Sequence, residues 1–230
     1  MSAFLECVLN REEIAMKKLI LSLVFGSTLV ACGGGSDSGD TSVPPSPEPA
    51  PELAADVCYL MDTSMGEVKL AIDLTNTPVT GNNFKQYVDE GFYDGVIFHR
   101  VITQFMAQTG GFTPGLIYKE GRDPITNESD VGISNARGTL AMARTSAPNS
   151  ATSQFFINAV DNTFLDKEHA QDGVGYAVFG KVIEGLEDVI DQIDIVKTGV
   201  AKDPDGNSFS DVPVEDIVIN SISETACPTR

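Results

Sequence analysis

The chain is organised around Phe98–Gly111, which reads Phe-His-Arg-Val-Ile-Thr-Gln-Phe-Met-Ala-Gln-Thr-Gly-Gly. This stretch holds one fixed cation (Arg100), an adjacent apolar pair (Phe105 and Met106) and one neutral amide (Gln108). Because successive side chains of a strand point to opposite faces, Met106 and Gln108 share a face. A guanidinium and an amide above an apolar floor suit a neutral, partly apolar ligand whose carbonyl needs a hydrogen bond. The stretch contains no nucleophile with a base, no metal cluster and no phosphate loop.

On both sides of this stretch, most of the globular part consists of short segments with strand patterns. The expected strands are residues 57–62, 67–73, 96–101, 105–108, 138–143, 153–158, 176–182 and 216–223. Only two helices are expected, over 77–91, with Thr77 as N-cap and Pro78 at the first helical position, and over 184–193. Residues 112–135 are rich in Gly, Pro, Asn and Asp and are expected to form surface loops. Many strands with two helices predict an all-β barrel or sandwich.

The N-terminal part predicts export. Met16–Cys32 has a short basic start and an apolar core, which is typical of a secretory signal peptide. Its end, Leu-Val-Ala-Cys, resembles the bacterial lipoprotein signal, in which Cys32 becomes the lipid-modified first residue; an ordinary signal peptide is the alternative. Residues 1–15 are expected to reflect a misassigned start codon. The chain is therefore divided into residues 1–31 (signal peptide and upstream extension), 32–54 (flexible lipoprotein tether) and 55–230 (globular domain).

The net charge argues against one class of partner, and the cysteines suggest a disulfide. Acidic residues outnumber basic ones by 33 to 15, which gives a formal net charge of −18. Such a surface repels phosphate backbones, so we expect no nucleic-acid partner. Cys58 and Cys227 lie near opposite ends of the globular part, and export permits a disulfide between them. Two buried free thiols are the alternative.

The sequence shows neither a hydrolase triad nor a metal-binding motif. The chain has two histidines, and alternation places His99 on the strand face opposite Arg100, whereas His169 lies in a loop full of charged residues. Nothing marks either as the oriented base of a triad. Residues 203–207 suggest a calcium loop, but Gly206 and Val214 occupy the wrong positions for one. We expect no metal and no cofactor.

A second predicted strand repeats the pairing of an amide with an aromatic ring, because Gln154 and Phe156 share a face. At this point the residues match a family. Phe98–Ile102, Phe105-Met106, Gln108, Gly110-Gly111, Gly138–Ala143, Ser153–Asn158 and Val178–Val182 resemble the signature of the cyclophilins, the peptidyl-prolyl cis–trans isomerases. The resemblance covers about residues 55–225. Residues 140–145 and 161–166 resemble the bacterial periplasmic type most.

The resemblance implies an eight-stranded antiparallel closed β-barrel capped by two α-helices. It also implies catalytic roles for Arg100, Phe105 and Gln108, and a substrate-binding groove made of Met106, Ala143, Arg144, Thr145, Gln154, Phe156, Phe164, Leu165 and Tyr176. Three of these positions depart from the familiar eukaryotic pattern: Phe164 stands for Trp, Tyr176 for His, and Arg144 for an Asn that binds the substrate backbone. The first two departures put cyclosporin sensitivity in doubt.

The expected function is isomerisation of X-Pro bonds in exported proteins, with Arg100 stabilising the twisted amide. The expected partners are proline-containing polypeptides, bound by a monomer that contacts the membrane through its lipid anchor only. The expected location is the bacterial cell envelope, on the outer membrane facing the periplasm. Two alternatives remain: a binding module or holdase that uses the same groove without turnover, and a purely structural envelope lipoprotein.

Overall fold

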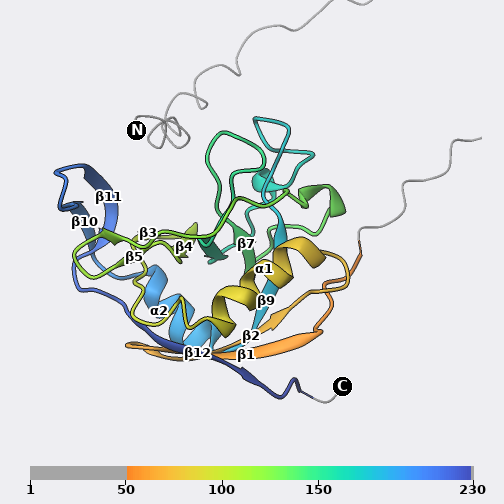
Figure 1. Ribbon diagram of the computed structural model, residues 1–230, viewed down its shortest axis with the longest axis horizontal. Coiled ribbons are helices and arrows are strands. Elements are labelled where there is room, and N and C mark those ends of the chain that lie inside the picture. Colours follow the sequence, from red (N-terminus) through yellow and green to blue (C-terminus); the bar gives the residue numbers. More distant parts are fainter. Residues whose placement is uncertain (1–50, 229–230) are drawn as a thin grey trace, which may run out of the picture. The chain divides into compact units, whose positions relative to one another are not determined.

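The computed structural model describes residues 51–228. Eight of its strands form one antiparallel sheet in the order β12-β1-β2-β9-β7-β8-β4-β3 (Figure 1). Their bounds are β1 (Val57–Thr63), β2 (Gly66–Ile72), β3 (Arg100–Ile102), β4 (Met106–Thr109), β7 (Thr139–Met142), β8 (Phe155–Asn158), β9 (Val178–Glu184) and β12 (Ile219–Thr225). The all-β fold and the eight-stranded antiparallel sheet are confirmed.

Two hairpins and a few helical segments complete the described part. The hairpins are β5 (Phe112–Thr113) with β6 (Ile117–Tyr118), and β10 (Thr198–Lys202) with β11 (Ser208–Pro213). The helical segments are α1 (Pro78–Asp89), a π-helical turn η4 (Leu186–Ile190) that continues into α2 (Asp191–Asp194), and the 3-10 turns η2 (Ser129–Val131) and η3 (Thr163–Leu165). No helix within residues 51–228 is long and apolar enough to cross a membrane.

The sheet is curled, but the prediction of a closed barrel is wrong. Its edge strands, β3 and β12, share no ladder. The residues just before them make only an isolated bridge, in which the Phe98 N–H donates to Ile217 O at 2.9 Å and the Ile219 N–H donates to Val96 O at 2.8 Å. The intervening Ile97 N–H points away from β12 and donates to Phe112 O of the neighbouring hairpin at 2.8 Å.

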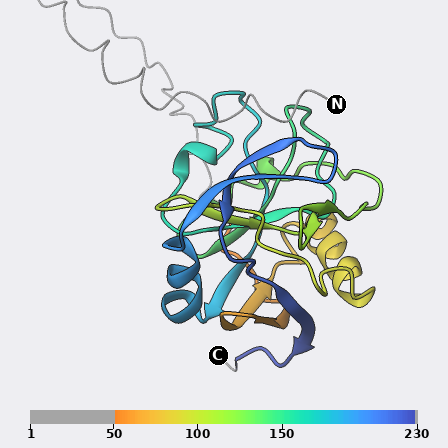
Figure 2. The ribbon, with the colours of Figure 1, turned by 90° about the vertical axis from the view of Figure 1, so that its left-hand side faces the viewer.

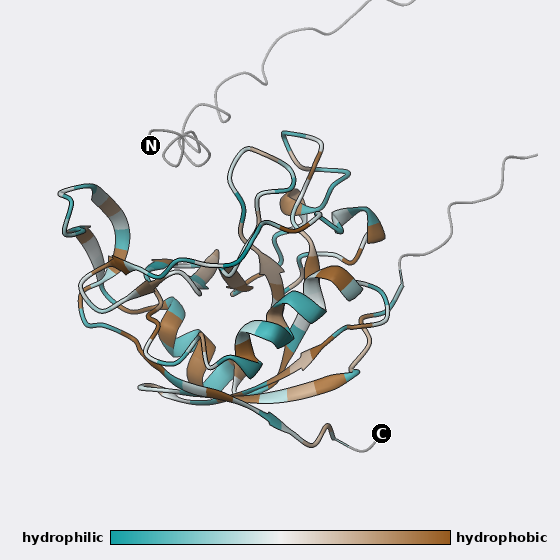
Figure 3. Ribbon diagram, viewed as in Figure 1, coloured by the Kyte–Doolittle hydropathy of each residue, from teal (hydrophilic) through white to brown (hydrophobic). Residues whose placement is uncertain are grey.

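The main core lies where α1 packs against the sheet. Phe84 is fully buried at its centre, and its ring lies 5.3 Å from Tyr93, 5.4 Å from Phe155 and 5.8 Å from Tyr59, measured between centroids. Figure 3 shows both apolar and polar residues along α1, as expected of a helix with one buried face. Aromatic pairs at these distances add to the apolar burial that stabilises the fold.

The helix α1 starts where the sequence predicts, with Thr77 at the N-cap position and Pro78 as the first helical residue, but its capping contact differs from the expectation. Thr77 does not cap the helix with its side chain; its hydroxyl donates to Asp73 O at 3.2 Å. The carboxylate of Glu128 instead accepts hydrogen bonds from the N–H groups of Val79 at 3.1 Å and Thr80 at 2.8 Å. A carboxylate is favoured there by the unpaired N–H groups and the helix dipole. This contact ties the long loop before β7 to the helix.

The expected disulfide is present. Cys58 of β1 is bonded to Cys227, which follows β12, across a sequence separation of 169 residues. Contacts with the domain begin before the predicted start at residue 55, because Glu52 O accepts a hydrogen bond from Asn76 and the Ala54 N–H donates to Asp73. The predicted signal peptide, the predicted lipidation site Cys32 and most of the predicted tether lie outside the described residues.

Candidate active site

The predicted site residues come together through the register of the sheet. Arg100 pairs with Gln108 across β3 and β4, and Gln108 pairs with Phe156 across β4 and β8. Phe156 in turn pairs with Ala141 of β7. Directly paired residues of antiparallel strands project to the same side of a sheet, so these four side chains form one row on one face. Met106, two residues before Gln108, shares that face.

A second apolar cluster occupies this face, separate from the main core. Its buried members are Met106, Ala141, Phe156 and Val178. Partly buried apolar side chains pack around them, namely Leu53, Ile102, Phe105, Ile133, Ala143, Leu165 and Tyr176. Six predicted site residues, Phe105 and five groove residues, therefore belong to one cluster, and Arg100 and Gln108 stand in the same row as Phe156. This is the apolar floor with a guanidinium and an amide beside it that the sequence suggests.

The side chain of Gln108 is held in place by the side-chain amide of Gln154. Its Nε2 donates to Gln154 Oε1 at 2.9 Å. The paired glycines after β4 make room for this contact: a Cβ at Gly111 would lie 2.6 Å from the Gln154 side chain, and Gly110 has a φ of +90° that other residues rarely adopt. The two amides are thus fixed relative to each other before any ligand binds.

Phe105 is positioned by contacts that the sequence did not reveal. Its carbonyl oxygen accepts hydrogen bonds from the Ala159 N–H at 3.0 Å and from Asn162 Nδ2 at 2.8 Å. The preceding residue, Gln104, has a φ of +57°, and its N–H donates to both carboxylate oxygens of Asp194 at 3.0 Å. Asp194 is buried, so a strained turn is held by an acidic side chain from α2.

Aromatic rings flank the cluster on two sides. Phe164 is 55% exposed, and its ring stacks on Phe105 with 5.6 Å between centroids. Tyr176 meets Phe156 edge to face at 5.7 Å. An exposed aromatic ring stacked on a half-buried one leaves apolar area for a bound chain to cover.

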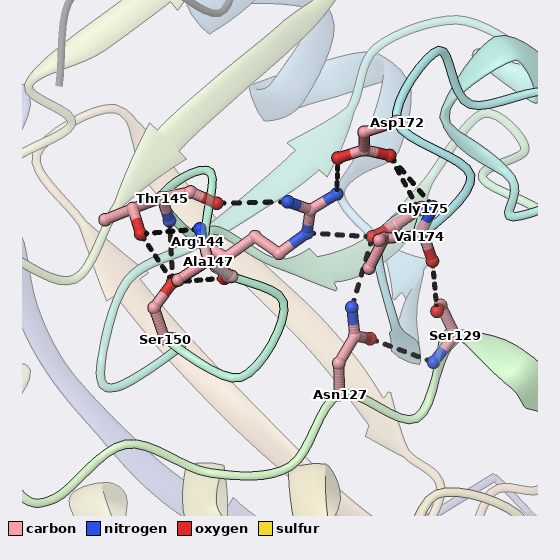
Figure 4. A network of polar contacts seen from close by, with 9 residues as sticks. All are labelled: Asn127, Ser129, Arg144, Thr145, Ala147, Ser150, Asp172, Val174 and Gly175. Carbon is pink, nitrogen blue, oxygen red and sulfur yellow. Dashed lines mark hydrogen bonds and ion pairs between the residues drawn. The ribbon is translucent and has the colours of Figure 1, made fainter. Parts of the chain in front are cut away.

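Arg144 is placed differently from the other predicted groove residues. Its side chain is only 2% exposed and stacks on the Tyr176 ring, with 4.5 Å from the guanidinium carbon to the centroid. Figure 4 shows its donors turned into a polar network: Nε donates to Gly175 O at 2.9 Å, Nη1 to Thr145 O at 3.0 Å and Nη2 to Asp172 at 2.5 Å. The guanidinium is thus committed to joining two loops.

Thr145 closes the loop on one side of this network. Its N–H and its hydroxyl both donate to Ser150 Oγ, at 2.9 and 2.8 Å, and its Oγ1 accepts the Ala147 N–H at 3.2 Å. On the other side, Asn127 Nδ2 donates to Gly175 O at 3.2 Å. The loop after β7 therefore has a defined conformation beside Ala143.

His99 lies on the face opposite Arg100, as alternation predicts. It is buried, and its ring packs against Phe112 at 4.7 Å. Burial lowers the pKa of His99 to about 3, and the positive charge of Arg100 acts in the same direction. The imidazole therefore stays neutral at physiological pH and is part of the framework behind the site.

Comparisons with known proteins identify similar chains. The model of the family described as cyclophilin type peptidyl-prolyl cis-trans isomerase/CLD matches residues 58–224. Peptidyl-prolyl cis-trans isomerase A of Dickeya dadantii is 50% identical over 162 residues, which cover 70% of this chain and 81% of the relative. Peptidyl-prolyl cis-trans isomerase B of Escherichia coli is 48% identical over 162 residues, 70% of this chain and 95% of the relative.

Solved structures show the same fold. A cyclophilin type peptidyl-prolyl cis-trans isomerase of Cryptosporidium parvum has a TM-score of 0.61 and 26% identity, and the match covers 75% of this chain and 99% of that one. Its structure in the presence of the dipeptide Ala-Pro has a TM-score of 0.60, with 26% identity, 74% of this chain and 99% of that chain covered.

Proposed function

Because the chain belongs to the cyclophilin-type peptidyl-prolyl cis–trans isomerases, we propose that it isomerises X-Pro bonds in exported polypeptides and that Arg100 stabilises the twisted amide. The observation that carries the Arg100 role is the row of Arg100, Gln108 and Phe156 on the face that holds the second apolar cluster. The Ala-Pro dipeptide named for a related structure supports a proline-containing ligand.

The reaction needs no bond to be made or broken. Resonance gives the X-Pro amide a rotational barrier of about 18–20 kcal/mol, so uncatalysed exchange takes tens to hundreds of seconds. In the twisted state conjugation is lost and the amide nitrogen becomes pyramidal, with a lone pair that can accept a hydrogen bond. A site that binds this state more tightly than the planar state lowers the barrier.

Each part of the site has a role in this scheme. The apolar side chains of Phe105, Met106, Phe156 and Leu165 hold the proline ring. Gln108 and the backbone at Ala143 and Arg144 hold the peptide on one side of the bond while the other side turns. Arg100 donates to the pyramidal nitrogen and to the rotating carbonyl oxygen, and it does so as a permanently charged group with several fixed donors.

The test is exchange kinetics on a short Ala-Pro peptide, measured by NMR with catalytic amounts of the protein. Wild-type protein should accelerate cis–trans exchange far above the uncatalysed rate. A holdase that uses the same groove would bind the peptide without accelerating exchange, and it would also suppress aggregation of a proline-free client. Absence of acceleration together with such suppression would therefore replace the isomerase proposal with the holdase.

For the cell, we extend the proposal to a lipid-anchored monomer on the outer membrane that faces the periplasm. It rests on the sequence pattern around Cys32, on the tether composition and on the disulfide, which an oxidising compartment favours. The full-length chain expressed in a Gram-negative host should fractionate with outer membranes, and Cys32→Ser should move it to the soluble fraction. A membrane-bound Cys32→Ser protein would contradict the anchor.

A further inference from the structure

The hairpin β10–β11, which was not expected from the sequence, lies beside the row of site residues. Figures 1 and 2 both show it next to β3, and the two elements are in contact. Its turn is closed by Asp203, whose Oδ1 accepts the Asn207 N–H at 2.8 Å. The hairpin is therefore a structured element at the edge of the sheet where Arg100 stands.

The hairpin contains a bulge. Gly199 pairs with Val212 and Ala201 pairs with Phe209, so Ser210 and Asp211 of β11 together oppose the single residue Val200 of β10. Asp211 has a φ of +60°, a left-handed conformation that costs free energy for any residue with a Cβ. Bulges of this kind are common next to active sites, where they redirect a side chain.

The redirected side chain reaches Arg100. Asp211 Oδ2 lies 3.8 Å from Arg100 Nε, and the same oxygen accepts a hydrogen bond from Ser210 Oγ at 3.1 Å. The Arg100 side chain is 25% exposed and that of Asp211 39% exposed, so the pair stands at the rim of the site. At 3.8 Å the interaction is an ion pair rather than a short hydrogen bond, and it acts on the Nε side of the guanidinium.

We propose that Asp211 is a positioning residue for isomerisation: the strained bulge holds its carboxylate against Arg100 Nε, which restricts the rotation of the guanidinium. Ser210 orients the carboxylate. This inference rests on the proposed catalytic role of Arg100. The strained conformation of Asp211 thus places a negative charge beside the donor that acts in the proposed transition state.

The test compares Asp211→Asn, Asp211→Gly and Asp205→Asn in the peptide exchange assay. Asparagine tolerates the left-handed conformation but removes the charge, and glycine removes both the side chain and the strain. A partly exposed ion pair contributes up to about 1 kcal/mol, so both Asp211 variants should lose about three- to fivefold in kcat/KM while the peptide Kd stays within about twofold. Asp205→Asn removes the same charge from the turn of the same hairpin and should behave like wild type.

Two further readouts separate positioning from a structural role. Asp211→Gly should keep or raise Tm, by up to about 4 °C for relief of about 1 kcal/mol of strain, while it loses activity. The Arg100 Nε–H resonance should broaden or exchange faster in both Asp211 variants and remain unchanged in Asp205→Asn. If the Asp211 variants match Asp205→Asn in turnover and in that resonance, the inference is wrong. A wild-type protein without turnover would instead overturn the proposed function itself.

Discussion

Arg100→Ala should lower kcat/KM for an Ala-Pro peptide about 100- to 1000-fold, which is the usual effect of removing a donor that acts on charge developing in the transition state. Peptide Kd should change only a few-fold, because in the proposed mechanism the proline ring is held by the apolar cluster around Met106 and Phe156 and not by Arg100. The measurement is exchange NMR at several peptide concentrations, which separates binding from turnover.

Two variants sharpen this prediction. Arg100→Lys keeps the charge but offers a point ammonium in place of the planar fork, so it should recover little of the lost rate. Arg122→Ala removes an arginine whose exposed side chain pairs with Glu90 and should leave turnover unchanged. An Arg100→Ala protein with a nearly wild-type exchange rate would refute the proposed mechanism. If the peptide Kd rose by the same factor by which kcat/KM fell, Arg100 would be a binding residue only.

Arg144→Ala should mainly destabilise the fold. The Arg144 side chain is buried, donates to Gly175 O, Thr145 O and Asp172, and stacks on Tyr176, so its removal takes away three hydrogen bonds and a ring contact and leaves a cavity between the two loops. We expect a loss of about 2–4 kcal/mol in the free energy of unfolding, which corresponds to roughly 4–16 °C in Tm for a domain of this size. Chemical denaturation followed by circular dichroism measures it.

Arg137→Ala is the matched control. Its guanidinium is 37% exposed and pairs with Asp191 and Glu187 at the surface, so its removal should cost at most about 1 kcal/mol. The family resemblance places Arg144 at a substrate-binding position. An Arg144→Ala protein of normal stability whose peptide Kd rises tenfold would show that the guanidinium itself contacts the substrate.

The contribution of Arg144 should also depend on pH. Burial raises the pKa of Asp172, but hydrogen bonds from Arg144 and from the N–H groups of Val174 and Gly175 outweigh this effect, so the pKa is lowered overall. A lowered pKa in the folded state stabilises the protein above the unfolded-state pKa, and this stabilisation is lost as the pH falls through the folded-state pKa. The stability gap between wild type and Arg144→Ala should therefore narrow in acid, below the ordinary pKa of an aspartate.

Much of the sheet and of the site could be predicted because both follow from local patterns. Alternation alone places Met106 with Gln108 and sends His99 to the opposite face, and the sheet register then brings Phe156 alongside. The pairing of an amide with apolar side chains occurs in two segments, around Gln108 and around Gln154, and each occurrence strengthens the prediction of a shared site.

The parts that could not be predicted depend on contacts between distant segments. Strands β10 and β11 expose residues such as Val200, 75% exposed, and their hydrophobic alternation is weak, so the hairpin looks like a loop. The acidic side chains of Asp194 and Asp211 act on Gln104 and Arg100 from other elements. Likewise, the inward turn of Arg144 is set by acceptors at Thr145 O, Gly175 O and Asp172.

The bond between Cys58 and Cys227 has a consequence for how the sheet opens. Strand β12 is an edge strand that pairs only with β1 within the sheet, and edge strands are where fraying begins. The disulfide links the segment after the C-terminal end of β12 to β1, so this end of the strand cannot separate from the sheet while the disulfide is intact. A reducing environment would release it, which would speed amide hydrogen exchange along β12.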